Sequence, residues 1–176
     1  LGAKTINDSV LTHLSLIKQS NVQFIWQTGK FYSEQIREEL EKKGKPDNLY
    51  VSDFIADMAK AYKAADLVIS RAGASSISEL CLLGKPCILV PSPNVAEDHQ
   101  TKNALALVKK DAAIYIKDSE AQMALLPKAV STVNEPERLV ALSRNIISLA
   151  HPDAARIIAE EVIRLAKEKK QAQHSN

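Results

Sequence analysis

The sequence has little of several features, and each shortage excludes a class of protein. Among 176 residues there are only 2 cysteines, and Cys81 and Cys87 belong to no Cys/His cluster with metal-site spacing. No apolar run approaches the about 20 residues that a membrane-spanning helix needs, and no secretory signal opens the sequence. We therefore expect two buried free thiols, no integral membrane span and a cytoplasmic location.

An excess of charge of one sign is also lacking. The 23 Lys and Arg residues stand against 21 Asp and Glu, which gives a formal charge of +2. Positive residues are spread along the chain apart from Lys167, Lys169 and Lys170, so nucleic-acid binding has no support. With 45% hydrophobic and 25% charged residues, the composition is that of one globular domain with a sizeable core.

Hydrophobic periodicity predicts helices and strands that alternate along the chain. Helices are expected over 7–19, 33–43, 56–64, 75–83, 97–110, 119–133, 136–149 and 153–169, and strands over 22–26, 49–54, 67–70, 87–90 and 113–116. This alternation indicates an α/β fold with a doubly wound parallel sheet and helices on both faces. Residues 1–170 are expected to form the domain and 171–176 a disordered tail.

In such a sheet, ligands bind outside the carboxyl ends of the strands. The loop after the third predicted strand has a glycine turn at Gly73, followed by a helix start rich in serine. Free N–H groups of a first helical turn bind phosphates, so Ser75, Ser76 and Ser78 mark a diphosphate site. Glu79, one turn further on, could accept hydrogen bonds from ribose hydroxyls. The alternative is that Ser75 or Ser76 is only an N-cap, with Glu79 completing a capping box.

The loop after the fourth strand, 91–103, is also dense in polar groups. Gln100 and Asn103 stand three apart, on one face of the helix that begins there. His99 could titrate near neutrality, but a surface histidine is more often solvated than catalytic. The other histidines have no acidic or serine partner at a telling spacing, so no catalytic triad is predicted.

Many short motifs, in order, resemble the C-terminal half of the MurG family, bacterial N-acetylglucosamine transferases of the GT-B class. Because they recur together at matching spacing over nearly the whole chain, they are more specific than any one alone. They are Leu1-Gly2-Ala3, Ile6-Asn7, Trp26-Gln27-Thr28-Gly29, Phe54-Ile55-x-Asp57-Met58, Ala61-Tyr62, Ala65-Asp66, Arg71-x-Gly73-Ala74, Ser78-Glu79, Gly84-Lys85-Pro86, Val90-Pro91, Asp98-x-Gln100 and Asn103-Ala104.

The resemblance implies a Rossmann-like domain that holds UDP-N-acetylglucosamine. By it, the backbone of Ile55 meets the uracil, Glu79 takes the ribose hydroxyls, and Gln100 contacts the sugar with Asn103 nearby. The remaining expected contacts with the nucleotide come from Gly73, Ala74, Ser75, Ser76, Ile77 and Ser78, with the first two serines at the diphosphate.

The implied reaction is inverting, metal-independent transfer of N-acetylglucosamine to a lipid-linked muramyl-pentapeptide in peptidoglycan synthesis. It needs a general base for the acceptor hydroxyl and stabilisation of the leaving UDP. The resemblance assigns the acceptor and the base to another, N-terminal domain, so no catalytic residue is expected here. No cofactor or metal is implied, and no Asp-x-Asp pair is present. The whole protein would sit peripherally on the cytoplasmic face of the inner membrane.

Two departures from the family pattern matter. The sequence opens at Leu1-Gly2-Ala3, inside the family's glycine-rich turn, so the central first strand and the acceptor domain are expected to lie outside it. Loss of that strand would leave an opening flanked by unpaired backbone groups. We expect a piece inactive alone, whose stability is marginal or supplied by self-association. The apolar stripe of the last helix, from Ile157 to Leu165, should pack on this domain or on the absent one.

Three alternative functions can be compared with the sequence. One is the donor half of another GT-B N-acetylglucosaminyltransferase, such as the dolichol-linked enzyme, which the run of bacterial motifs disfavours. Another is a non-catalytic module that binds UDP without sugar preference. A Rossmann dehydrogenase needs Gly-x-Gly-x-x-Gly after a strand, and this sequence has none.

Overall fold

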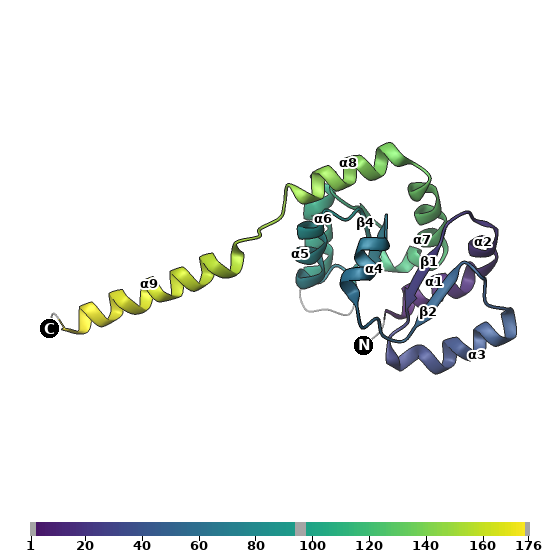
Figure 1. Ribbon diagram of the computed structural model, residues 1–176, viewed down its shortest axis with the longest axis horizontal. Helices are drawn as coiled ribbons and strands as arrows, with labels where there is room; N and C mark the ends of the chain where they lie inside the picture. The colour runs from purple at the N-terminus through teal and green to yellow at the C-terminus, as the bar shows by residue number, and fades with distance from the viewer. Residues whose placement is uncertain (1–2, 94–97, 175–176) are drawn as a thin grey trace.

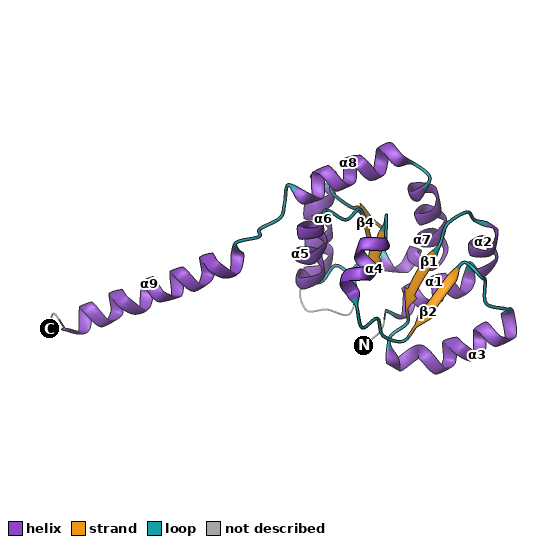
Figure 2. Ribbon diagram, in the orientation of Figure 1, coloured by secondary structure: helices purple, strands orange, loops and turns teal. Residues whose placement is uncertain are grey.

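The computed structural model describes residues 3–93 and 98–174, in which helices and short strands alternate (Figure 1). The elements are α1 Lys4–Thr12, α2 Leu14–Gln19, β1 Phe24–Gln27, the 3-10 turn η1 Lys30–Tyr32, α3 Ser33–Lys43, β2 Leu49–Ser52, α4 Met58–Ala64, β3 Val68–Ser70, α5 Ala74–Leu83, β4 Cys87–Leu89, α6 His99–Val108, β5 Ile114–Tyr115, α7 Asp118–Val133, α8 Pro136–Ile147 and α9 Ala154–His174. In Figure 2 the strands lie in the main body with helices around them, and no described helix covers β1 and β2 on the side toward the viewer.

The strands form two parallel sheets. β1 pairs with β2, with Phe24 opposite Leu49, and β4 lies between β3 and β5. No ladder of hydrogen bonds joins β1 to β3 within the described strands. The predicted parallel architecture is therefore confirmed, but as two sheets rather than one.

Side chains of β4 alternate between two apolar cores, one on each face of the sheet. Ile88, with Val90 just beyond the strand, packs with residues of α1, α3 and α7, whereas Cys87 and Leu89 pack with residues of α5, α6 and α8. Because period-two alternation sends successive side chains to opposite faces, helices must cover both faces. This arrangement confirms the doubly wound α/β fold.

The structure corrects several element boundaries. The helix predicted over 7–19 is two helices, because the backbone of His13 leaves the helical conformation and its ring Nδ1 lies 2.9 Å from the Ser9 carbonyl oxygen. The strand predicted to reach Phe54 ends at Ser52, whose hydroxyl donates to the Phe54 carbonyl at 2.8 Å and closes a turn. Residue 97, the predicted start of the helix over 97–110, lies outside the described residues.

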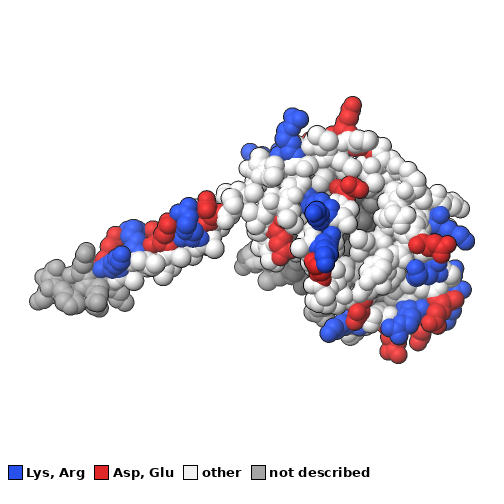
Figure 3. Space-filling view, viewed as in Figure 1, with Lys and Arg blue, Asp and Glu red and all other residues white. Residues whose placement is uncertain are grey.

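Helix α9 projects away from the rest of the molecule (Figure 1). Its apolar side chains Ile157, Ile158, Val162 and Leu165 are more than half exposed, so the stripe does not pack on this domain. Charged residues lie along one side of the helix (Figure 3). The helix continues to His174, past the predicted end and into the segment expected to be a disordered tail. Among the described helices, none has both the length and the apolar character needed to cross a membrane.

Candidate functional site

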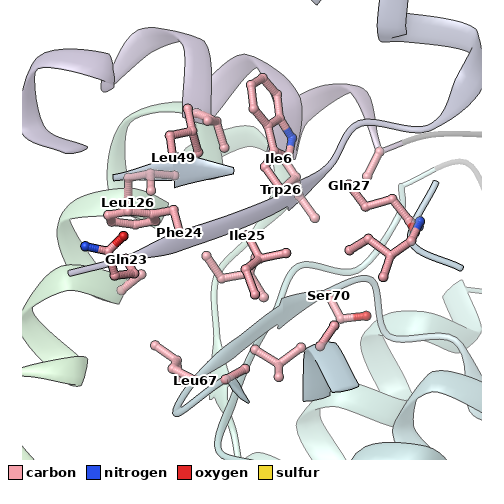
Figure 4. Close-up of a pocket in the computed structure, with 18 of the residues that line it drawn as sticks. Ile6, Gln23, Phe24, Ile25, Trp26, Gln27, Leu49, Leu67, Ser70 and Leu126 are labelled. Atoms are coloured by element: carbon pink, nitrogen blue, oxygen red, sulfur yellow. The ribbon is translucent and has the colours of Figure 1, made fainter. Parts of the chain in front are cut away.

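A channel separates the two sheets. It has a volume of about 1380 Å³ and runs between β1 and β3, with Ile25 and Leu67 among its lining residues. Gln23 and Leu67 lie at one end and Gln27 and Ser70 at the other, so the two strands run in the same direction along it (Figure 4). The expected opening beside the sheet is therefore present, and its carboxyl end adjoins the loops where a ligand should bind.

The loop after β3 leads straight into the first turn of α5. Gly73 is the N-cap residue, and the helical ladder starts with the Ile77 N–H donating to the Gly73 carbonyl at 3.0 Å. No side chain caps this helix, so the capping-box reading of the serines and Glu79 is wrong. A Cβ added at Gly73 would meet no atom within 4 Å. The first-turn N–H groups have no intrahelical acceptor and, among the described residues, no capping side chain.

Glu79 is exposed and accepts a hydrogen bond from a residue of α4. The Tyr62 hydroxyl donates to Glu79 Oε2 at 3.2 Å, and Tyr62 also lines the channel. Burial of the phenol, and next the charge of Glu79, raise the pKa of Tyr62 above its ordinary 10.0. The phenol therefore stays a donor to the carboxylate throughout the neutral range.

The turn after β2 is fixed by a side chain from β1. Gln27 Oε1 accepts the backbone N–H of Ile55 at 2.8 Å, across the carboxyl end of the two-stranded sheet. This bond fixes the Ile55 backbone beside the channel, since Ile55, Met58 and Tyr62 are among the residues that line it.

Two amide side chains of α6 brace the neighbouring loops. Gln100 Oε1 accepts the Ser92 N–H at 2.9 Å, and Asn103 Nδ2 donates to the Ala72 carbonyl at 3.2 Å. Both residues are half-buried, on the helix face predicted from their spacing. They join the loop after β4 to the loop after β3, which brings α6 beside the start of α5.

Arg71 ties the same loops to the opposite face of the sheet. Its Nη1 donates to the carbonyls of Val90 and Pro91 at 3.1 and 3.2 Å and pairs with Asp118 at the start of α7. Thr5 of α1 donates to the other oxygen of Asp118 at 3.0 Å. The network fixes where the strands β3 and β4 release their loops.

The structure thus gathers the predicted site residues at one edge of the fold. Ala74, Ser75 and Ser78 are exposed on α5, whereas the side chain of Ile77 packs on the α5 core and its N–H bonds the Gly73 carbonyl. Sequence reasoning gave no role to Gln27, Tyr62 or Arg71, although all three stand inside motifs that carry the family resemblance. Residues 94–97 of the polar loop 91–103 lie outside the described part of the chain.

The described residues offer little for metal or thiol chemistry. They contain no group of three or more His, Cys, Asp or Glu side chains able to hold a metal ion. Cys81 and Cys87 are free and buried, as predicted. Burial raises the pKa of Cys87 to about 12, so its thiol is protonated and unreactive near neutrality.

Parallel strands with helices on both faces, and loops gathered at the carboxyl ends of those strands, define a Rossmann-like α/β domain. Residues 1–158 match the family described as Glycosyltransferase family 28 C-terminal domain, and the chain belongs to this family.

Curated relatives support the same assignment. The chain is 63% identical over 169 residues to the "UDP-N-acetylglucosamine--N-acetylmuramyl-(pentapeptide) pyrophosphoryl-undecaprenol N-acetylglucosamine transferase" of Bacteroides fragilis, covering 96% of this chain and 44% of that protein. The protein of the same name from Parabacteroides distasonis is 56% identical over 96% of this chain and 46% of its own length. The chain therefore spans less than half the length of these relatives.

Solved structures agree in fold. Acinetobacter baumannii MurG superposes with a TM-score of 0.78 at 31% identity, covering 93% of this chain and 47% of that one. The glycosyltransferase VinC, solved in complex with dTDP, gives a TM-score of 0.73 at 16% identity, covering 94% of this chain and 40% of that one. The second likeness shows the fold alone.

Proposed function

We propose that this chain is the donor-binding domain of a MurG-type transferase and holds UDP-N-acetylglucosamine. The observation that carries the proposal is the convergence, at one edge of the sheet, of the uncapped start of α5, the exposed carboxylate of Glu79 and the braced backbone of Ile55. These three features match the diphosphate, the ribose and the base of a nucleotide.

The donor is proposed to lie along the carboxyl edge of the sheet. Its diphosphate meets the first-turn N–H groups of Ala74, Ser75 and Ser76, where the helix dipole stabilises the charge that grows on the leaving UDP. The ribose hydroxyls bond Glu79, and the uracil meets the backbone of Ile55. The sugar then reaches Gln100 on α6, with Asn103 holding the adjacent loop.

The remaining parts of the reaction are assigned to the rest of the protein. The lipid-linked muramyl-pentapeptide acceptor and the general base would come from the N-terminal half present in the relatives, so this chain alone is expected to bind donor without turnover. Peripheral contact with the cytoplasmic face of the membrane would also come mainly from that half.

We propose that the channel between β1 and β3 receives one further parallel strand in the whole protein. The channel is bordered by β1 and β3, two strands that run in the same direction and have no partner among the described strands on this side. Ala3, the residue before α1, also lines the channel. A strand entering α1 there would give the usual right-handed crossover to β1. Hydrogen exchange tests this: amides of β1 and β3 should be at least tenfold more protected in the whole protein than in this chain.

Calorimetric titration with UDP-N-acetylglucosamine, UDP-glucose and UDP tests the donor site. Glu79→Ala should lower the affinity for all three ligands because it removes the ribose contact. Gln100→Ala should lower the affinity only for the N-acetylglucosamine donor. Glu38→Ala and Gln35→Ala, which truncate exposed side chains of α3, are matched controls and should change nothing.

Each contrary outcome has a distinct meaning. If a folded wild-type chain binds none of the ligands, the proposed donor site is wrong for this chain. UDP binding with no preference among sugars would instead favour a nucleotide-binding module without transferase specificity.

A further inference from the structure

Glu79 alone would be a poorly ordered ribose ligand. Its side chain is exposed on α5, and a free glutamate samples several rotamers that binding must then restrict. The Tyr62 hydroxyl, at 3.2 Å from Oε2, is the contact that limits this freedom. It engages one carboxylate oxygen and leaves Oε1, with further lone pairs, for a pair of neighbouring hydroxyls.

The position of the Tyr62 hydroxyl is itself set by the fold. The ring of Tyr62 packs against the core formed by residues of α5, α6 and β4. The helix that carries it, α4, is capped by Asp57, whose Oδ1 accepts the Lys60 N–H at 3.0 Å and fixes the first turn. The hydroxyl is therefore delivered to Glu79 by packed and capped structure rather than by a mobile loop.

The same short segment links two parts of the proposed nucleotide site. Ile55, held by Gln27, lies just before the start of α4, and Tyr62 lies on that helix. Ile55, Met58, Tyr62 and Ser76 all line the channel. Placement of the base-contacting backbone and placement of the ribose-contacting carboxylate therefore depend on one structural unit.

We propose that Tyr62 is a positioning residue for ribose recognition: its hydroxyl orients Glu79 so that the free carboxylate oxygen meets the 2′- and 3′-hydroxyls of the bound nucleotide. This inference rests on the proposed donor site. It goes further by assigning to α4 a share of the selectivity for ribonucleotides, although Tyr62 itself need not touch the ligand.

The test compares two ligands that differ only at the ribose. UDP and 2′,3′-dideoxy-UDP are titrated into the wild type, Tyr62→Phe, Glu79→Ala and the double variant. Tyr62→Phe keeps the packed ring and removes only the hydroxyl. Tyr50→Phe, which removes the hydroxyl of a 62% exposed tyrosine on β2, is the matched control.

We expect Tyr62→Phe to lower the affinity for UDP about 3- to 10-fold, which is the effect of losing one hydrogen bond. Binding of 2′,3′-dideoxy-UDP should change less than about twofold, because that ligand makes no bond to the carboxylate. Adding Tyr62→Phe to Glu79→Ala should have no further effect on UDP, since the two residues act through one contact.

The possible outcomes distinguish an error in the role of Tyr62 from an error in the proposed donor site. If Tyr62→Phe weakens both ligands equally, or neither, while the wild type discriminates between them, Tyr62 only ties α4 to α5 and the inference is overturned. If the wild type binds UDP but Glu79→Ala has no effect, the ribose contact is misassigned. Failure of the wild type to bind UDP overturns the donor site and this inference together.

Discussion

β1 and β4 are both short parallel strands that end in loops of the candidate site, but they are buried very differently. Cys87, Ile88 and Leu89 of β4 are 0% exposed, whereas Ile25 of β1 is 49% exposed on the wall of the channel. One half of the site, around α5 and α6, thus stands on a strand enclosed on both faces and both edges. The other half, around Ile55, stands on a strand with one open edge.

The contrast separates two tasks that the proposed ligand imposes. Charge on a diphosphate must be met by dipoles that do not move, and α5 and α6 are anchored on the enclosed strand. The base is proposed to meet the turn at Ile55, whose backbone is held by one side chain, Gln27, at the end of the open strand. We expect the three-stranded half to dominate stability and the two-stranded half to adjust more readily.

The largest difference should come from truncating one apolar side chain in each half. Leu89→Ala removes a fully buried side chain and should lower the free energy of unfolding by about 2–5 kcal/mol. Ile25→Ala, on the channel wall, should cost about 1 kcal/mol or less because half the side chain already meets solvent. Urea denaturation measures both, and equal losses would break the comparison.

The two-stranded half contains a buried polar side chain, Asn7, that joins α1 to β1 by two hydrogen bonds. Asn7 is buried, donates to the Thr28 carbonyl and accepts from Trp26 Nε1, each at 2.9 Å. Asn7→Ala leaves a buried donor and a buried acceptor unpaired and should cost about 2–4 kcal/mol by urea denaturation. Asn145→Ala, which removes an exposed contact to the Asp111 carbonyl, is the control and should cost under about 1 kcal/mol.

Alkaline pH offers a test confined to the enclosed strand. In the unfolded chain the Cys87 thiol ionises near 9.0, but burial raises its folded pKa to about 12. The stability linked to this thiol is therefore complete below pH 9 and falls as pH rises toward 12, by about 2 kcal/mol at pH 10.5. Cys87→Ala should lack this part of the slope between pH 8 and 10.5; an unchanged slope would mean that water reaches β4.

The sequence predicts the enclosed half better than the open one. The strand at Cys87 to Val90 and the helix stopped at Gly84 are predicted correctly, because the apolar run is short and Gly84 and Pro86 separate it from the helix before it. Errors gather in the other half, at the break of the first helix at His13 and the early end of β2 at Ser52. Both depend on side chain to backbone hydrogen bonds, which hydrophobic patterning does not report.

In the candidate site, too, the sequence predicts which residues take part but not the hydrogen bonds between them. Residue types indicated that Glu79, Gln100 and the serines belong together, since loops at the carboxyl edge must meet. They could not indicate that Tyr62 would reach Glu79 from another helix, or that Gln27 would hold Ile55, because such pairings are decided by packing across distant segments. Motif membership was the available signal for both.

Two glycines at opposite ends of α5 give the finest test, because one serves the fold and the other the proposed ligand. Gly84 ends the helix at φ 59, and a Cβ there would lie 3.3 Å from Ile147 Cδ1. Gly84→Ala should therefore cost about 1–2 kcal/mol of stability, measured by urea denaturation, and leave UDP affinity unchanged.

Gly73→Ala should behave in the opposite way. Gly73 has φ −68, and a Cβ added there meets nothing within 4 Å, so stability should stay within about 0.5 kcal/mol of the wild type. The new methyl would stand over the first turn of α5, where the diphosphate is proposed to lie, and UDP affinity should fall about tenfold or more. If Gly73→Ala binds UDP as tightly as the wild type, the diphosphate does not approach this turn, and the anion site must be sought elsewhere along the carboxyl edge.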